Sequence, residues 1–576
     1  MYIYKIKIEN FRNFECFEWK PNKHSNIIFG SNGSGKTNLA IALDMLFSTN
    51  RNESYFDNAD FYCGDIDKKI HIEAWLADID NAQFEISEII QYIDENDELV
   101  YEDSVKPVKK VIIVQLENGV DGKKEWSIVQ NDDFKDFSLR KRDAVGYTFI
   151  SADRQPLKEI NLNTRSKVYS LSEGKIDEAL DNMSKDIINY ADGKFMEQPK
   201  ILEFLSKLNN IIELKLWDNL EIALKNPQSI WNYSGYEIRS NKNGASLTFD
   251  RQSKGFQNIF LLSLIKATLN ENAIVFIEEL EQNLEPKNQR QIANSFCKTS
   301  SGQRFITSHS ADLISCFDFD DILLLNKDCI RLIAERSDEK FRRQVSQSNK
   351  KDYIASLMAS NILIVEGESE LSSFHIYSAE LDEILYKKDL EIIMAKGKSN
   401  ISLYAQKYKS LGKKVIALID NDNDVETTLE AISANCDEIY IACDSYEDMI
   451  YPYLGNKNEE LCEILPFNMI KDKLMSYKNR CDEDIKTKDK LVKDEVLKLD
   501  FEMITNYDSL YPNKFLFNFS IHDRFATPYY ARSIANIIVC DGVPEQVKIL
   551  FESILQENKN LAKFANIDNV YYLKNE

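Results

Sequence analysis

The sequence has few of the residues on which histidine- or cysteine-based sites depend. Its 576 residues include five scattered histidines, and none of the ten cysteines forms a C-x-x-C pair. A zinc site or a histidine-based nuclease centre is therefore not expected, because such sites need clustered nitrogen and sulfur ligands.

Signals for export or membrane insertion are also missing. No uninterrupted apolar run reaches the roughly 18 residues that a membrane-spanning helix needs. The opening stretch, MYIYKIKIENFRNF, alternates apolar and polar residues, which predicts a strand rather than a signal peptide. A cytoplasmic protein with reduced cysteines is expected.

The chain lacks a positive net charge. It has 71 Lys and Arg against 94 Asp and Glu, which gives a formal charge of −23. This argues against a general polyanion binder coated in lysine. DNA binding through a local basic groove is still allowed, because charge is screened over about 10 Å.

The hydrophobic fraction of 43% permits a large core, and the length suits about two to four domains.

The pattern along the chain predicts an α/β protein in three parts. Residues 1–345 are strand-rich, but about 161–235 repeat apolar residues at intervals of three and four, which predicts a helical insertion that could serve dimerisation. Residues 355–455 alternate strands and helices, and 456–576 are mainly helical. The basic stretch Glu335–Asp352 suggests a linker or a phosphate-facing segment.

A nucleotide site is predicted where NIIFGSNGSGKTNLAIALDMLF reads as strand, glycine loop and helix. Gly30 to Thr37 fits G-x-x-x-x-G-K-[ST], in which backbone N–H groups and the helix start face phosphate oxygens. Lys36 would reach the outer phosphates and Thr37 would hold Mg²⁺. The other loop residues expected to contact nucleotide are Gly30, Asn32, Gly33, Ser34 and Gly35.

A second element of this site is the apolar run Ala273–Ile277, a predicted buried strand that ends in Glu278 and Glu279. Glu278 could bind Mg²⁺ through water, and Glu279 could polarise the attacking water as a general base. An acidic strand end is often structural by itself, but the glycine loop favours the catalytic interpretation.

Two weaker signals follow the loop in the sequence. Ser253, Gly255 and Gln257 fit S-x-G-x-Q before an apolar helix, and a strand delivers His309 in RFITSHSADLI. In this order the motifs resemble the ABC-type ATPase heads of the SMC-like class. The resemblance implies that ATP lies between two heads, and hence a homodimer or higher homo-oligomer.

This sequence departs from that pattern mildly. Gln252 stands where the signature usually opens with leucine, and Glu278 replaces the usual aspartate. The Q-loop is represented by one candidate, around Asp60, and Arg154 is a candidate for a phosphate or switch contact.

Acidic residues recur at predicted strand ends in the second part of the chain. One apolar strand, Ile362–Val365, ends in an E-G-x-x-E stretch, and another, Val415–Ile419, runs into three alternating aspartates. A third strand precedes an E-D pair. The acids at these ends are Glu366, Glu370, Asp420, Asp422, Asp424, Glu447 and Asp448.

These carboxylates are expected to converge, because the carboxyl ends of parallel strands form one crevice. Like charges at one site stay ionised when divalent metal compensates them. Oxygen donors suit Mg²⁺ or Mn²⁺, with two ions predicted here and one with ATP. Taken alone, Asp420–Asp424 would more often be a solvated loop. Asp424 is expected to lie outside the ligand set.

The order E-G-x-x-E, D-x-D, E-D resembles the Toprim domain of topoisomerases, primases and related nucleases. Behind an ABC-type ATPase it resembles the OLD (overcoming lysogenization defect) family, whose members include the Gabija nuclease subunit and effectors encoded beside retrons. The resemblance implies an ATP-regulated, metal-dependent DNA endonuclease in antiphage defence. It also implies a companion protein: a helicase, or a reverse transcriptase with its DNA.

The resemblance also implies roles for single residues. Glu366, Asp420 and Asp422 would hold the metals, with Glu370 on the following helix and Glu447 or Asp448 as the later acid. Family members place a basic residue from the C-terminal part near the scissile phosphate. Arg524 and Lys514 are the candidates here.

Two other functions remain open at this point. An ATP-driven DNA clamp with an inactive Toprim unit would retain DNA without making new ends. Topoisomerase or primase chemistry would need a further domain, for which the chain has little room. The sequence does not decide whether ATP activates or inhibits cleavage.

Overall fold

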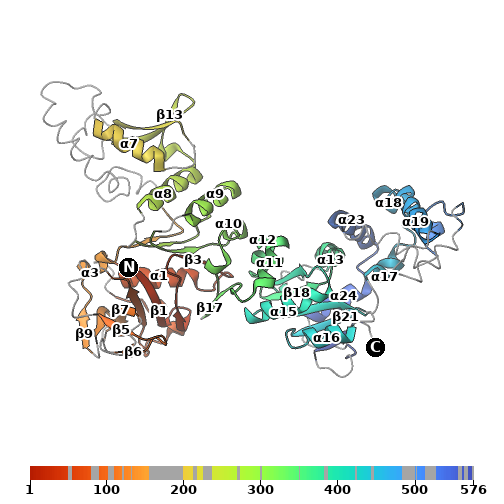
Figure 1. The fold of residues 1–576 in the computed structure, drawn as a ribbon, viewed down its shortest axis with the longest axis horizontal. Coiled ribbons are helices and arrows are strands. Elements are labelled where there is room, and N and C mark those ends of the chain that lie inside the picture. Colours follow the sequence, from red (N-terminus) through yellow and green to blue (C-terminus); the bar gives the residue numbers. More distant parts are fainter. Residues whose placement is uncertain are drawn as a thin grey trace. The chain divides into compact units, whose positions relative to one another are not determined.

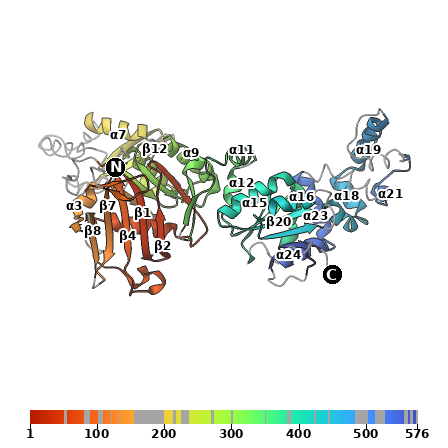
Figure 2. The ribbon, with the colours of Figure 1, turned by 60° about the horizontal axis from the view of Figure 1, so that its bottom comes forward.

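The computed structural model covers most of the chain. The described residues are 1–49, 55–79, 90–100, 109–119, 122–130, 133–154, 199–211, 217–224, 236–268, 273–298, 301–327, 329–348, 350–381, 387–421, 425–442, 446–482, 500, 502–512, 527–555, 561–563 and 569–573. They belong to two compact units, Met1–Ser337 and Asp338–Glu576, which Figure 1 and Figure 2 colour from red at the N-terminus to blue at the C-terminus.

A mainly parallel sheet lies at the centre of the first unit. Its order is β10 (Tyr147–Ile150), β14 (Ile274–Ile277), β15 (Gln303–Thr307), β3 (Ser25–Phe29), β16 (Ile322–Asn326) and β17 (Cys329–Leu332). Only β17 pairs antiparallel with its neighbour. Strands β3, β14 and β15 are buried at every residue, as expected of apolar runs covered on both faces.

A second, antiparallel sheet in this unit contains the N-terminal strand that the sequence predicted. Its strands are β1 (Tyr2–Phe11), β2 (Phe14–Trp19), β4 (His71–Ala77), β5 (Gln91–Ile93), β6 (Leu99–Val100), β7 (Lys109–Asn118), β8 (Lys124–Gln130) and β9 (Asp133–Asp136). Helix α1 (Lys36–Phe47) packs against strands of both sheets. Ile6, Leu39 and Phe276 therefore share one buried core.

The expected helical insertion is only partly helical where it is described. Helix α7 (Pro199–Ile211) is present, but the predicted helical reading of Asn219–Leu224 is wrong. These residues form strand β11, which pairs with β12 (Tyr236–Lys242) and β13 (Ala245–Thr248) in a small sheet. Leu220 and Ile222 are both buried. Apolar side chains at every second position therefore fit a strand here and not a helix. Residues 155–198 lie outside the described part.

The other described α-helices of the first unit are α3 (Leu139–Ala144), α8 (Lys254–Thr268), α9 (Pro286–Cys297) and α10 (Ala311–Ile314). Helices α9 and α10 follow β14 and β15 of the parallel sheet, whereas α3 and α8 precede β10 and β14. Helix α8 is the apolar helix expected after the S-x-G-x-Q motif.

The second unit is built on a fully parallel five-stranded sheet. Its order is β19 (Leu390–Met394), β18 (Asn361–Val365), β20 (Lys414–Asp420), β21 (Glu438–Ala442) and β22 (Val570–Tyr572). Helices α13 (Glu368–Glu380), α15 (Ile401–Ser410) and α16 (Val425–Ile432) follow β18, β19 and β20. The predicted βα alternation is thus confirmed.

The C-terminal region is mainly helical, as expected, and completes this unit. Its described helices are α17 (Tyr446–Ile450), α18 (Asn458–Ile464), α19 (Phe467–Asp482), α21 (Tyr507–Leu510), α23 (Pro528–Val539) and α24 (Glu545–Leu555). The exception is β22, a short strand that extends the sheet beside β21. Buried residues of the sheet and these helices form one core.

The basic stretch before β18 contains the boundary between the two units, at Ser337 and Asp338, and is mostly helical. It forms α11 (Glu339–Ser348) and α12 (Lys350–Ser356), and Phe341 packs edge-on against Tyr353 and Tyr404. Helices α11 and α12 therefore belong to the second unit. Within the described residues, no helix combines the length and the apolar character needed to cross a membrane.

Candidate ATPase and nuclease sites

The glycine loop between β3 and α1 depends on its glycines. Gly33 and Gly35 have φ values of 79° and 105°, in the region that L-residues with a side chain rarely adopt. A Cβ on Gly30 would lie 2.3 Å from the Leu325 carbonyl oxygen. The expected loop is therefore present, and Asn32 is exposed within it.

Lys36 lies folded back on this loop. Its Nζ donates to the carbonyl oxygens of Gly30 and Ser31 at 2.9 and 3.0 Å, and to Ser34 Oγ at 3.3 Å. Burial lowers the pKa of Lys36 to about 8, although nearby glutamates oppose that shift. These oxygen atoms accept hydrogen bonds from the ammonium group, as phosphate oxygens would.

The two predicted Mg²⁺ ligands of the nucleotide site lie in contact. Thr37 Oγ1 donates a hydrogen bond to Glu278 Oε1 at 2.5 Å. The other oxygen, Glu278 Oε2, accepts the backbone N–H of Ala152 at 3.1 Å. A hydroxyl and a carboxylate so placed suit a hard cation bound with ATP.

Glu279 and Arg154 form a half-buried junction beside this pair, and the backbone of Glu279 is strained. Glu279 has a φ of 44°, and its N–H donates to Thr307 Oγ1 at 3.0 Å. Arg154 donates to the carbonyl oxygens of Glu278 and Glu279. Burial lowers the pKa of Arg154 to about 10, and its Nε and Nη1 have no hydrogen-bond partner among the described residues. The structure therefore puts the candidate switch residue against both glutamates.

His309 belongs to the same site. Burial and the charge of Lys36 both lower the pKa of His309. Its backbone N–H donates to Glu281 Oε1 at 2.5 Å, while the residue is exposed. The histidine is therefore held by its backbone with its side chain open to a ligand or a partner.

Ser253 and Gln257 of the S-x-G-x-Q motif have different environments. Ser253 is exposed and its Oγ accepts the Phe256 N–H at 3.2 Å, at the start of α8. Gln257 is buried, and its Nε2 donates to the carbonyl oxygens of Phe249 and Gln252. The Ser253 side chain is thus at the surface, whereas Gln257 fixes the turn before the helix.

Asp60, the Q-loop candidate, is engaged in an ion pair. Arg12 Nε and Nη2 contact Asp60 Oδ1 at 3.0 and 2.9 Å. Arg12 Nη1 also donates to Asn38 Oδ1 on α1 at 3.3 Å. Arg12 thus links the Asp60 carboxylate to helix α1, which follows the glycine loop. A Q-loop role for Asp60 stays a prediction.

The predicted nuclease acids lie at neighbouring strand ends. Glu366 follows β18, Asp420 is the last residue of β20, and these strands pair directly. The Asp420 N–H donates to Glu366 Oε1 at 3.4 Å. Glu370 is buried in the first turn of α13, and a Cβ on Gly367 would lie 3.1 Å from Glu370 Oε2. Glycine in E-G-x-x-E thus leaves room for the second glutamate.

The third strand end, that of β21, also reaches this edge. Ala442 pairs with Asp420 in register, and α17 begins at Tyr446 with half-buried Asp448 on its first turn. Burial, with nearby Tyr377 and Glu370, raises the pKa of Tyr446 well above its usual range. Helix α17 therefore starts close to the helix that carries Glu370.

Several predicted residues cannot be placed. Asp422, Asp424, Lys514, Arg524 and the side chain of Glu447 lie outside the described residues. Among the residues that the structure does describe, no group of three histidine, cysteine or acidic side chains is arranged to hold a metal ion. The D-x-D half of the expected ligand set is therefore untested.

The turn between β19 and α15 lies beside these acids. After β19, the Gly397 N–H donates to the Glu366 carbonyl oxygen at 3.0 Å. Asn400 Nδ2 donates to the carbonyl oxygens of Ala395 and Lys396, both at 3.1 Å. Lys396 is exposed and has a φ of 55°. The A-K-G-K-S-N stretch signalled a turn, but only strand order shows that it brings a lysine to the acidic edge.

Two family models match the chain. One, described as "AAA domain, putative AbiEii toxin, Type IV TA system", matches residues 25–315. The other, described as "Overcoming lysogenization defect protein-like, TOPRIM domain", matches residues 357–422. Together they span the glycine loop, His309 and the first acids of the second unit.

Similar proteins are known at low sequence identity. Endonuclease GajA of Bacillus cereus (strain VD045) is 23% identical over 446 residues, which cover 73% of this chain and 75% of GajA. The Smc head domain of Pyrococcus furiosus is 16% identical and covers 60% of this chain and 99% of its own, with a TM-score of 0.38. The recombination mediator protein RecF is 14% identical and covers 58% and 98%, with a TM-score of 0.33.

Proposed function

Because the chain belongs to the OLD family, with an AAA/ABC-type ATPase domain followed by an OLD-like Toprim domain, we propose that it is an ATP-regulated, divalent-metal-dependent DNA endonuclease. The observation that carries this proposal is the contact between Asp420 and Glu366 at adjacent parallel strand ends. Buried Glu370 adds a third carboxylate near the same edge. Carboxylates are costly to gather unless a cation binds them.

The donor set fits Mg²⁺ or Mn²⁺. Glu366, Glu370 and Asp420 offer only carboxylate oxygen, which hard divalent cations prefer. We assign Asp422 and Asp448 to the same set, with Glu447 as the alternative later acid. Two bound ions would activate water and stabilise the departing oxygen of a phosphodiester.

The chain's own residues prepare this edge. The β18 and β20 ends fix the spacing of Glu366 and Asp420. Lys396 lies in a turn held by hydrogen bonds from Asn400 and Gly397, and its ammonium group would bind a DNA phosphate. It joins Lys514 and Arg524 as a candidate for the basic group near the scissile bond.

Nucleotide binding would control cleavage. Lys36 would exchange the carbonyl oxygens of its own loop for ATP phosphates, Thr37 and Glu278 would hold Mg²⁺, and Glu279 would act as the general base. Exposed Ser253 would complete the ATP site of a second chain, so we propose a homodimer or higher homo-oligomer.

The biological setting we propose is antiphage defence in the cytoplasm. DNA is the substrate, and a companion protein, a helicase or a reverse transcriptase with its DNA, supplies the trigger. The endonuclease name of GajA supports the chemistry. An alternative is an ATP-driven DNA clamp with an inactive Toprim unit, which predicts ATP-dependent DNA retention without new ends.

Plasmid cleavage in Mg²⁺ or Mn²⁺, with and without ATP, tests the proposal. Asp420→Asn should lower the cleavage rate by at least about 100-fold, the scale on which one electrostatic group affects kcat. Asp424→Asn is the matched control, because we place it outside the ligand set, and it should keep substantial cleavage. Equal loss in both would show that this division is wrong, and unchanged cutting by Asp420→Asn would sink the nuclease assignment.

A further inference from the structure

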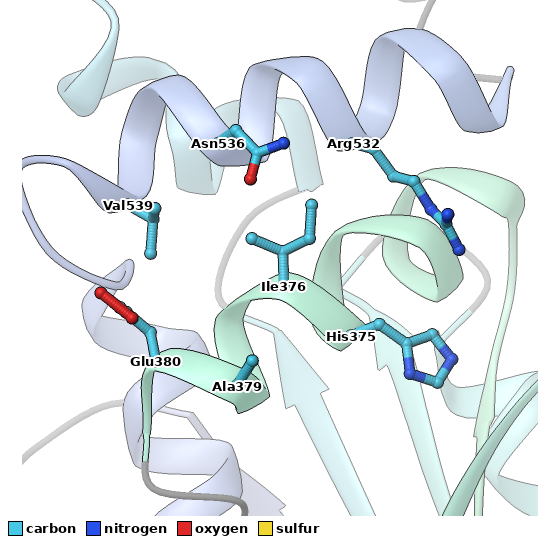
Figure 3. Close-up of a pocket in the computed structure, with 7 residues that line it drawn as sticks. All are labelled: His375, Ile376, Ala379, Glu380, Arg532, Asn536 and Val539. Atoms are coloured by element: carbon cyan, nitrogen blue, oxygen red, sulfur yellow. The ribbon is translucent and has the colours of Figure 1, made fainter.

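A solvent-open groove lies between α13 and α23 in the second unit. Ser373 Oγ on α13 donates to the Ala531 carbonyl oxygen on α23 at 3.3 Å, and beyond this contact a hollow of about 570 Å³ opens. Figure 3 shows the two helices running side by side in the same direction, with residues of both facing the hollow. Both helices therefore begin at the same side of the unit.

One end of this groove is cationic. His375 and Arg532 lie together there, and Glu380 lies at the opposite end (Figure 3). Burial and then the charge of Arg532 lower the pKa of His375. Among the described residues, neither side chain has a hydrogen-bond acceptor or a carboxylate partner. The chain has a net charge of −23. Two neighbouring hydrogen-bond donors that have no carboxylate partner are therefore suited to binding an anion.

The position of the pair relative to the acids selects the anion. His375 lies five residues after Glu370 on α13, which is about 7.5 Å along the helix axis. Five residues also turn the helix by about 140°, so His375 lies on a different face of α13 from Glu370 and would meet a strand that continues past the acidic edge rather than the cut bond itself. The groove is open and has an apolar wall from Ile376 and Val539, so it does not enclose a small ligand.

We propose that this groove binds a backbone phosphate of the DNA substrate, away from the cut bond, through Arg532 and His375. The inference rests on the proposed endonuclease function and adds a contact that positions the strand. A phosphate contact carries affinity and register but no sequence information. The residues therefore act on DNA binding rather than on the chemical step.

Binding of a DNA duplex in EDTA, where metal-dependent cutting cannot occur, tests the groove directly. Arg532→Gln and His375→Gln should each weaken binding roughly 3- to 10-fold, and Arg532→Gln, which removes a fixed charge, should also reduce the slope of log K against log salt by about one. Arg532→Lys should restore most of the affinity, because a phosphate needs charge more than shape. Lys548→Gln, which removes an exposed cation from α24, is the matched control and should bind as the parent does.

Cleavage under metal separates the groove from the catalytic edge. Arg532→Gln should raise KM for plasmid and keep kcat, and its thermal unfolding midpoint should match the parent's. Parent-like affinity in both variants and a parent-like salt slope in Arg532→Gln, with a parent that binds and cuts DNA, would overturn this inference alone. A parent that neither binds nor cuts would overturn the proposed function instead.

Competition with inorganic phosphate shows whether the groove binds a DNA phosphate or a free phosphate compound. At constant ionic strength, added phosphate should displace no more DNA than chloride does. If phosphate displaces DNA specifically, and Arg532→Gln abolishes that effect, the groove takes a free phosphate compound and the DNA contact is wrong.

Discussion

At the residue scale, Lys36 shows how burial prepares a charge for a ligand. The ammonium group is held by backbone carbonyl and hydroxyl oxygens, and burial lowers its pKa to about 8. Triphosphate would bring negative charge to the same place and raise that pKa again. Nucleotide binding is therefore coupled to protonation of a single side chain.

This coupling predicts a pH dependence of ATP affinity. Below pH 8 Lys36 is already charged without ligand, so affinity should change little. Above that, ATP must bind with uptake of a proton, and the dissociation constant should rise by up to about tenfold per pH unit. Calorimetric titration from about pH 7 to about pH 9.5 checks it. Lys36→Arg, whose guanidinium stays charged, should remove the slope, and a flat profile in the parent would contradict the coupling.

At the element scale, α8 is held against the turn that follows β14. Asn258 Nδ2 donates to the Gln282 carbonyl oxygen at 2.9 Å. A Cβ on Gly255 would lie 2.7 Å from the Asn283 carbonyl oxygen. A glycine is therefore required here because the Asn283 backbone lies too close for a side chain. This requirement does not depend on any contact with a second head.

Gly255→Ala should thus disturb the protein even without a partner. The added methyl meets backbone, which moves less easily than a side chain, so the free energy of unfolding should fall by about 1–3 kcal/mol. Denaturant unfolding measures the loss. Lys254→Ala, an exposed neighbour on the same turn, should stay within about 0.5 kcal/mol. Equal stability of the two variants would mean that the contact is relieved by a backbone shift.

At the scale of the whole molecule, one ATP site is expected to use two chains. Lys36 and Ser253 would then act in trans, and two inactive variants could complement each other. An equal mixture of Lys36→Ala and Ser253→Arg chains should recover about a quarter of the parent's ATP hydrolysis, because half of the dimers carry one intact site of two. If exchange of differently tagged chains is verified and no activity returns, the composite site is wrong.

Most of the fold was predictable because its signals are local. Buried parallel strands appear as apolar runs, such as Ile274–Ile277, and glycines mark the loop before α1. The exceptions were short segments with a weak pattern. Asn219–Leu224 was assigned to a helix because apolar residues upstream recur at three and four, but pairing with β12 imposed a period of two.

The sequence alone determined which residues could do chemistry: the loop Gly30–Thr37, the glutamates after β14, and the acids at successive strand ends. It could do so because motif spacing is a property of adjacent residues. Tertiary structure decided which of them meet. Thr37 contacts Glu278 across 241 positions, the Lys396 turn lies against Glu366, and α23 lies along α13. Such contacts depend on strand order and helix packing, which local spacing does not encode.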